Sequence, residues 1–270
     1  MFGMIGNKPT SQRKIAVRLA AATGALAFGL AGSMGVMSSS KGPTAPGPAQ
    51  AAGLVSERQE LEMGRDAARQ VEQKYRVVSG TREARMVEDM GRRLAAVSGR
   101  PRLNWQFRVI DERAVNAFSV PGYVYIHTGL LNAIGDDTDA LAGVVAHEIA
   151  HTDARHSKKQ MEKGAVAGLL GALITKGGRK NAGWFNLGAN VVLLNYSRGD
   201  EYEADRLAVR YLQQTGYDPR GMIRFFEKLQ RMEGRSGGPE FFRTHPNSGN
   251  RIARIRQMIR EGESDSGRRR

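Results

Sequence analysis

The stretch that most constrains this chain is GVVAHEIAHTDARH, residues 143–156, which holds three of its five histidines. Two of them, His147 and His151, are four positions apart, so on a helix they lie one turn apart on the same face. Both imidazoles can then reach a single metal ion. Asp137 or Thr138 is placed to cap this helix, and apolar neighbours predict that the helix is buried. An exposed helix with incidental histidines is the weaker alternative.

Glu148 follows the first histidine and is rotated from it by about 100° around the helix axis. Its carboxylate can therefore touch a metal-bound water without ligating the metal. Zinc fits this set, because it is bound by neutral imidazoles and keeps an open position for water. The two histidines leave the site one ligand short. His156 is rejected as the third ligand, because its spacing from His147 and His151 directs it to other faces of the same helix, and it is interpreted as a packing or capping residue.

The missing ligand is predicted in NYSRGDEYEADRLAV, residues 195–209. Glu201 and Asp205 are four positions apart and share one helical face, whereas Glu203 is turned to the far side. We assign metal ligation to Glu201. Asp205 is expected to accept the other ring N–H of a ligating histidine. Acidic residues also favour helix starts, which is the alternative explanation, but the paired histidines outweigh it.

Capping residues and hydrophobic periodicity predict a mostly helical α+β domain with a small sheet. Ser56 and Gln59 have capping-box spacing at the start of one helix. The other predicted helices span 82–97, Ser197 to Gly216, Asp218-Pro219 to Gly234, and a C-terminal segment with Ile252, Ile255 and Ile259 on one side. The predicted strands are 105–110 and 123–128, and the uncharged segments 164–175 and 181–197 are predicted to be buried helices.

Composition divides the chain into four parts. Residues 1–40 resemble an export signal or an N-terminal membrane anchor, because a basic segment precedes the uncharged run 19–40. Positive charge before that run predicts that the rest of the chain crosses the membrane. Residues 41–55 are expected to be a flexible linker. The folded domain is predicted over 56–260, and 261–270 is expected to be a basic C-terminal tail.

The net charge of +14 does not by itself indicate nucleic-acid binding. Beyond the basic N-terminal segment and the terminal arginines, the basic residues are scattered among acids, without a stripe interleaved with aromatic side chains. A solvated basic surface that can face an anionic membrane is the favoured interpretation. The chain has no cysteine, which excludes disulfides, thiolate ligands and a cysteine nucleophile.

The paired motifs resemble those of a known family of zinc peptidases, the one that includes the CAAX prenyl proteases. The resemblance is closest to its soluble bacterial members in the periplasm, of the kind that enhances β-barrel assembly. The motifs are His147-Glu148-x-x-His151, Ala154-Arg155-His156 and Glu201-x-x-Ala204-Asp205, supported by Asn116-Ala117-Phe118, Pro121-Gly122, Gly129-Leu130 and Thr244-His245-Pro246 with Arg251. The similarity covers roughly 56–260 and implies a zincin-like (gluzincin) fold with an active-site helix. Tyr123 departs from the second glycine that is usual at its position.

The resemblance implies one Zn²⁺ per chain on the two histidines and the carboxylate assigned above. Glu148 would take a proton from the water that attacks a peptide carbonyl. His245 is given two alternative roles: it stabilises the oxyanion of the tetrahedral intermediate, or it occupies the open zinc position as a latch. Arg251 is a further candidate site residue. The strand expected to pair with an extended substrate by β-addition comprises Gly122, Tyr123, Val124 and Tyr125.

These expectations describe an exported zinc endopeptidase that hydrolyses misfolded or stalled cell-envelope proteins. It would lie in the periplasm or cell envelope, soluble after signal cleavage or anchored to the inner membrane by its N-terminus. Its expected partners are unfolded or misassembled proteins and the outer-membrane assembly machinery, with membrane contact through the N-terminus and no nucleic acid. The alternative is a chaperone-like or adaptor protein on the same scaffold, which binds unfolded envelope clients with little proteolysis.

Overall fold

The computed structural model describes residues 55–160, 162–163, 196–233, 239–246 and 249–268. The predicted export signal therefore lies outside the described residues, as does the linker apart from Val55. The two uncharged segments that were predicted to be buried helices also lie outside them, except for Tyr196 and Ser197.

A four-stranded mixed sheet has the strand order β1-β2-β4-β3. Its strands are β1 (Val77–Val78), β2 (Gln106–Ile110), β3 (Ala117–Val120) and β4 (Tyr123–His127). β2 and β4 are parallel, and the other two pairs are antiparallel. The two strands expected from the sequence are confirmed as β2 and β4. The strands β1 and β3 are too short to show an alternating pattern, and they were not predicted.

β4 is an inner strand, which corrects the prediction that the segment Gly122, Tyr123, Val124 and Tyr125 pairs with substrate. One side of Tyr123–His127 pairs with β2 and the other side pairs with β3, so its backbone hydrogen-bonding groups are used within the sheet. Gly122 has φ +87° and belongs to the tight turn between β3 and β4, where glycine avoids backbone strain. Among the described residues, the sheet edge beyond β4 is β3. Sequence periodicity marks strands but does not reveal their order, which explains the error.

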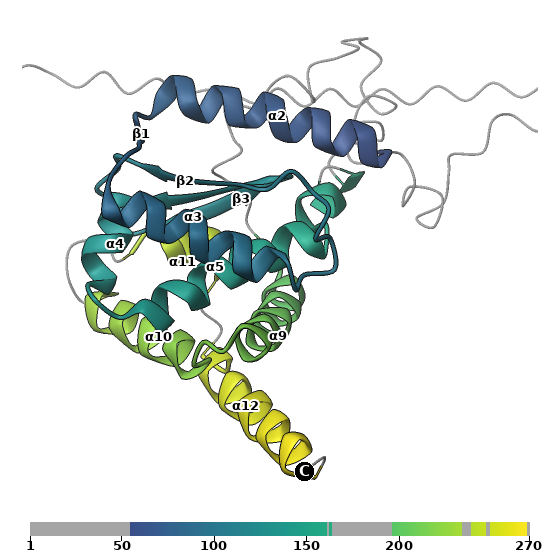
Figure 1. The fold of residues 1–270 in the computed structure, drawn as a ribbon, viewed down its shortest axis with the longest axis vertical. Helices are drawn as coiled ribbons and strands as arrows, with labels where there is room; N and C mark the ends of the chain where they lie inside the picture. The colour runs from purple at the N-terminus through teal and green to yellow at the C-terminus, as the bar shows by residue number, and fades with distance from the viewer. Residues whose placement is uncertain (1–54, 161, 164–195, 234–238, 247–248, 269–270) are drawn as a thin grey trace, which may run out of the picture. The chain divides into compact units, whose positions relative to one another are not determined.

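Helices cover both faces of this sheet (Figure 1). α2 (Glu57–Lys74) packs on one face, and α3 (Arg82–Ala95) and α5 (Thr138–Asp153) pack on the other. The alternation of side chains along β4 explains this division. Val124 and Ile126 point into the core that contains α3 and α5, whereas Tyr125 points to the face covered by α2.

The predicted helix starts are present. The Ser56 hydroxyl accepts a hydrogen bond from the backbone N–H of Gln59, and the Gln59 side chain accepts one from the backbone N–H of Ser56. For α5 the capping residue is Asp137, whose carboxylate accepts from the N–H of Ala140 at 3.0 Å. These side chains replace hydrogen bonds that the first turn of a helix lacks.

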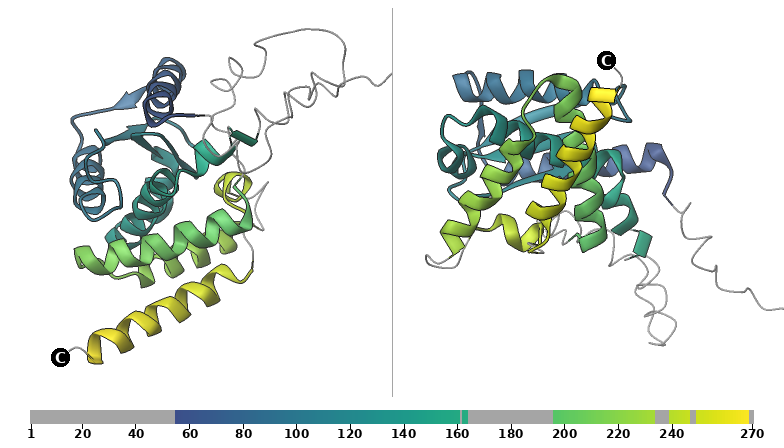
Figure 2. Two further views of the ribbon diagram at one scale, coloured as in Figure 1. Left: turned by 90° about the vertical axis from the view of Figure 1, so that its right-hand side faces the viewer. Right: turned by 90° about the horizontal axis from the view of Figure 1, so that it is seen from below.

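Three further long helices complete the domain: two of them pack against α5, and the last packs against those two on the side away from α5 (Figure 2). They are α9 (Arg198–Thr215), α10 (Arg220–Glu233) and α12 (Arg251–Arg268), and the short helices α4 (Thr128–Ile134) and α11 (Phe241–Thr244) lie in the connections. The one-sided pattern predicted for the last helix is confirmed: Ile255 and Ile259 are buried and Ile252 packs against the core. α12 continues beyond residue 260, so part of the predicted tail is helical.

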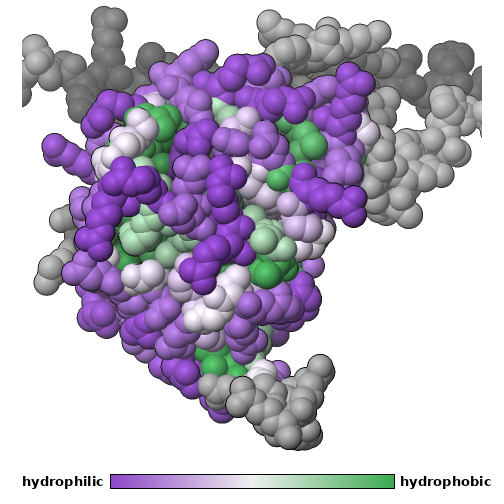
Figure 3. All heavy atoms as spheres, in the orientation of Figure 1, coloured by the Kyte–Doolittle hydropathy of each residue, from purple (hydrophilic) through white to green (hydrophobic). Residues whose placement is uncertain are grey.

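The described chain is thus an α+β domain, mostly α, with a small mixed sheet, and its fold is zincin-like. The face shown in Figure 3 is largely hydrophilic, and apolar residues appear there as small separate patches. Isolated apolar side chains of this kind are normal on a folded domain. Within the described residues, no helix combines the length and apolarity that a membrane span requires.

Gly221 permits the close contact between the starts of α10 and α5. A Cβ atom at this position would lie 2.3 Å from the carbonyl carbon of Asp139, which is backbone and cannot rotate away. We therefore expect Gly221→Ala to lower the free energy of unfolding by about 1–3 kcal/mol, the usual cost of overpacking. Urea denaturation measures this change. Gly249→Ala, where an added Cβ meets open space, is the control, and equal stabilities of the two variants would contradict the prediction.

Candidate metal centre

α5 carries His147, Glu148 and His151 inside the core of the domain. Every residue from Ala140 to Thr152 is buried, because α5 packs against α3, the sheet, α9 and α10. Polar side chains on such a helix need partners inside the protein. The Nε2 atoms of His147 and His151 lie 2.9 Å apart, consistent with imidazoles one helical turn apart.

α9 supplies carboxylates from the opposite side. The helix has the predicted limits: Ser197 and Asp200 form a capping box at its start, and Gly216 ends it in the left-handed conformation with φ 79°. Glu201 therefore lies in the first turn, fully buried and facing α5. Its Oε2 atom is 3.4 Å from Nε2 of His147, and its Oε1 atom is 3.4 Å from Nε2 of His151.

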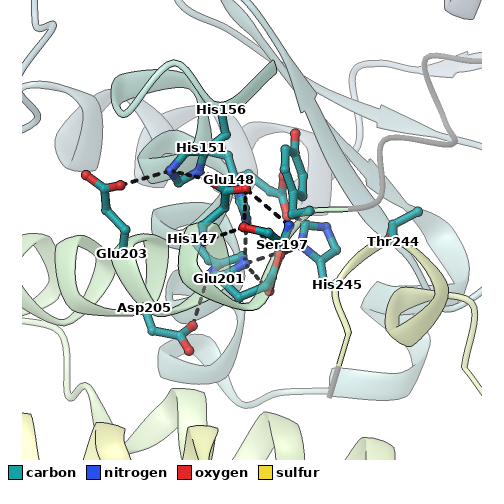
Figure 4. Close-up of polar contacts among 12 residues, drawn as sticks. His147, Glu148, His151, His156, Ser197, Glu201, Glu203, Asp205, Thr244 and His245 are labelled. Carbon is teal, nitrogen blue, oxygen red and sulfur yellow. Dashed lines mark hydrogen bonds and ion pairs between the residues drawn. The ribbon is translucent and has the colours of Figure 1, made fainter. Parts of the chain in front are cut away.

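Four buried side chains converge at this point (Figure 4). One nitrogen or oxygen of each lies within 4.8 Å of the corresponding atoms of the others, and the four residues are His147, His151, Glu201 and His245. The structure therefore brings together the three residues assigned as ligands from the sequence and adds His245. Imidazole nitrogens with one carboxylate oxygen are ligands typical of zinc.

The two histidines of α5 need either a proton or a cation between their facing nitrogens. Nitrogens at hydrogen-bond distance cannot both present lone pairs to each other, so one must carry a proton unless a cation binds. Burial opposes the charged form, but Asp205 and Glu201 outweigh it and raise the pKa of His147 to about 9. Burial and the charge on His147 hold the pKa of His151 well below its usual value. A metal ion between the two nitrogens would take the place of that proton, because both lone pairs could then point at the ion.

The charge balance around the cluster also fits a divalent cation. In the part of the chain that the structure describes, Glu148, Glu201 and Asp205 are buried together with a single guanidinium, that of Arg251. Arg251 binds Glu201 at 2.6 Å and holds Asp205 with two hydrogen bonds of 2.6 and 2.8 Å. Burial opposes ionisation of Glu201, yet His245 and Arg251 hold its pKa well below the usual range. With these carboxylates ionised and the histidines neutral, as metal ligation requires, the set carries two net negative charges, which a divalent cation would offset.

Asp205 lies where the sequence argument places it, one turn after Glu201 on the same face of α9. Its Oδ1 atom is 3.1 Å from Nδ1 of His147, close enough to accept the ring N–H. Such a contact directs the Nε2 lone pair of His147 toward the cluster. Burial disfavours the Asp205 carboxylate, but Arg251 and His147 lower its pKa overall.

His245 immediately follows α11 and is fully buried. Its ring stacks on Phe241, with centroids 4.5 Å apart and planes inclined by 21°. Its Nδ1 atom lies 3.2 Å from Oε1 of Glu201, and its Nε2 atom lies 3.3 Å from Oε1 of Glu148. His245 therefore lies between the candidate ligands and the candidate base.

Two neighbours of His151 were not identified from the sequence as site residues. α5 ends at Asp153, and Arg155 has φ 55°, so His156 begins a new helical segment and does not continue α5 as expected. His156 is absent from the four-residue cluster, but its Nδ1 atom lies 2.9 Å from Nδ1 of His151. Tyr196 stacks on His151 with centroids 3.8 Å apart. The Ala154-Arg155-His156 motif is the sequence signal for the contact of His156 with His151, and the sequence carries no comparable signal for the stacking of Tyr196.

Comparison with known proteins identifies a peptidase family. A sequence profile described as "Peptidase family M48" matches residues 81–259. The chain is 29% identical over 216 residues to the "Beta-barrel assembly-enhancing protease" of Yersinia pestis, an alignment that covers 75% of this chain and 44% of the relative. It is 32% identical over 188 residues to the "Putative beta-barrel assembly-enhancing protease" of Vibrio cholerae, covering 65% and 39%. It is 33% identical over 178 residues to "Mitochondrial metalloendopeptidase OMA1" of Schizosaccharomyces pombe, covering 64% and 52%.

The chain spans about half the length of these relatives, or less. The matched profile includes both metal-ligand motifs of the sequence and most of the described fold. These findings support the metallopeptidase part of the resemblance drawn from the sequence. A specific likeness to the CAAX prenyl proteases stays a prediction.

Proposed function

The chain belongs to peptidase family M48, and on that premise we propose that it is a zinc metalloendopeptidase. The observation that carries the proposal is the buried convergence of His147, His151 and Glu201, which come from two helices about fifty residues apart in the sequence. These three side chains would hold one Zn²⁺ per chain. When bound, zinc would supply Lewis-acid chemistry, acidifying a water molecule and polarising a peptide carbonyl.

Glu148 is the proposed general base. It follows the first ligand on α5 and is fully buried, and among the described residues its one ion pair is with His245. Its carboxylate is therefore available to exchange a proton with a water in the site. Glu148 would take a proton from the attacking water and pass it to the leaving amine. Arg251 would be a positioning residue, because its guanidinium binds the carboxylates of Glu201 and Asp205 and fixes their orientations.

His245 is proposed to act as a latch. Its side chain and those of the ligands are almost completely buried, so a peptide can reach Glu148 only if a neighbouring group moves. The His245 ring lies beside both Glu201 and Glu148 and would occupy the fourth ligand position. The oxyanion role remains the alternative, because an imidazole that swings away from Glu201 could still donate a hydrogen bond to the reacting carbonyl.

If His245 is a latch, removing it should increase basal activity. If the latched state predominates, the open state is typically populated to no more than about 10%. Opening every molecule by His245→Ala should therefore raise basal peptide cleavage by about 10-fold or more. Cleavage of a fluorogenic unfolded substrate, with zinc content measured in parallel, tests this. The double variant with Glu148→Gln should be inactive. Loss of cleavage in His245→Ala with zinc retained would contradict the latch and support the oxyanion role.

An extended substrate is proposed to pair with β3. It is the sheet edge next to β4 among the described residues, and it packs against α5, which carries the catalytic groups. Backbone pairing of this kind selects extended, unfolded segments more than particular side chains. This replaces β4 as the proposed substrate strand.

We further propose that the protein is exported and acts on misfolded or stalled proteins of the cell envelope, in the context of outer-membrane assembly. The support comes from the names of the bacterial relatives and from the signal-like N-terminus of the sequence. The segment shared with each of these bacterial relatives is less than half of the relative's length.

Zinc-dependent cleavage of denatured β-casein tests the proposed activity. The full chain should cut this substrate, lose activity after chelation and regain it with stoichiometric zinc. The competing function is a chaperone-like protein that binds unfolded clients without cutting them. Suppression of client aggregation without cleavage, in zinc-loaded protein and in His245→Ala alike, would favour that function.

A further inference from the structure

Three polar side chains contact one another in series between the metal cluster and the surface: the candidate ligand His151, then His156, then Glu203. The Nδ1 atom of His151 lies 2.9 Å from Nδ1 of His156, and Nε2 of His156 lies 3.2 Å from Oε2 of Glu203 (Figure 4). His151 and His156 are fully buried, whereas the Glu203 side chain is 40% exposed. Asp200 provides a second carboxylate oxygen 3.6 Å from Nε2 of His156.

Only one arrangement of the ring hydrogens of His151 and His156 is compatible with metal binding. The Nε2 atom of His151 faces Glu201 and His147, so it must present its lone pair there, and Nδ1 must then carry the hydrogen. That hydrogen needs an acceptor, and Nδ1 of His156 is the atom within reach. His156 is then a neutral imidazole whose remaining hydrogen is on Nε2, directed at the Glu203 carboxylate.

The two candidate histidine ligands therefore differ in the group that accepts the hydrogen of their Nδ1 atom. Nδ1 of His147 faces the Asp205 carboxylate at 3.1 Å, whereas Nδ1 of His151 faces a neutral ring. Among the described residues, Glu148, Glu201 and Asp205 already place three carboxylates in the same buried region as Arg251. The neutral imidazole of His156 can orient His151 without adding a further negative charge to this region.

We propose that His156 is a positioning residue that fixes His151 in the Nδ1–H tautomer, with Glu203 orienting His156 from outside. This inference rests on the proposed metal site. Tyr196 restrains the same ring by stacking on its face, so His156 acts on the edge of the ring and Tyr196 on its plane.

The proposal is tested by the zinc affinities of two variants whose new side chains have nearly the same shape. In the full chain, His156→Leu removes the acceptor, while His156→Asn keeps an oxygen near the position of Nδ1. We expect His156→Leu to weaken zinc binding by about 10- to 100-fold in competition with a chromophoric chelator, the usual effect of losing such a contact. His156→Asn should retain most of the wild-type affinity. Wild-type affinity in His156→Leu, or equal losses in the two variants, would overturn the proposal.

A second measurement does not depend on how well the variants fold. With only five histidines in the chain, two-bond ¹H–¹⁵N correlation spectra of the wild-type protein can assign each tautomer. We expect His151 to be in the Nδ1–H form before zinc is added, and finding the Nε2–H form would reject the role of His156. If wild-type protein shows that tautomer but binds no zinc, the proposed function fails while the tautomer assignment stands.

Discussion

Replacing Glu148 with glutamine should leave zinc bound and abolish most hydrolysis. Glutamine has nearly the same shape as glutamate but cannot take up a proton, and a positioned general base contributes about 10²- to 10⁴-fold to the rate. We therefore expect cleavage of an unfolded substrate to fall by about that factor in Glu148→Gln. Initial rates, together with zinc content, measure both parts of the prediction.

Glu227→Gln is a matched control, because it makes the same chemical change on α10 in an ion pair with Arg256, away from the cluster. It should cut substrate at the wild-type rate. Normal cleavage by Glu148→Gln would show that another group serves as the base. Loss of zinc from this variant would mean that Glu148 contributes to holding the ion, contrary to its assignment.

The second large effect is expected at Glu201. In Glu201→Ala the cluster loses its only carboxylate ligand, while Arg251 keeps its two hydrogen bonds to Asp205 and can remain in place. We expect zinc affinity to fall by more than about 100-fold, beyond the range typical of outer contacts. Chelator competition measures the affinity, and circular dichroism establishes that the fold is retained.

Glu203→Ala is the control for that experiment, since Glu203 lies two residues away on another face of α9. Its carboxylate contacts His156 and Lys159 and does not belong to the four-residue cluster. Its removal should weaken zinc binding far less, because Asp200 remains near His156. Equal losses in Glu201→Ala and Glu203→Ala would contradict the assignment of Glu201 as the ligand.

Local rules accounted for the parts of the site that depend on helical spacing. His147 and His151 face one point because they are four residues apart, and the same spacing stacks Glu201 with Asp205. The capping box at the start of α2 and the limits of α9 were also visible in the sequence, because helix ends require particular side chains at fixed offsets.

Features that depend on tertiary packing could not be predicted in this way. The inner position of β4 follows from pairing with the short strand β3, which carries no periodic signal. The contact of His156 with His151 depends on the chain turning at Arg155 after α5 ends. The resemblance suggested that His245 belongs to the site, but only the structure shows its ring between Glu201 and Glu148.

The most direct test of the metal site is anomalous scattering at the zinc edge from crystals of the zinc-loaded protein. The result we expect is a single peak per chain about 2.0–2.2 Å from Nε2 of His147, Nε2 of His151 and a carboxylate oxygen of Glu201. A peak bound elsewhere, or a site in which Glu201 is not a ligand, would contradict the account.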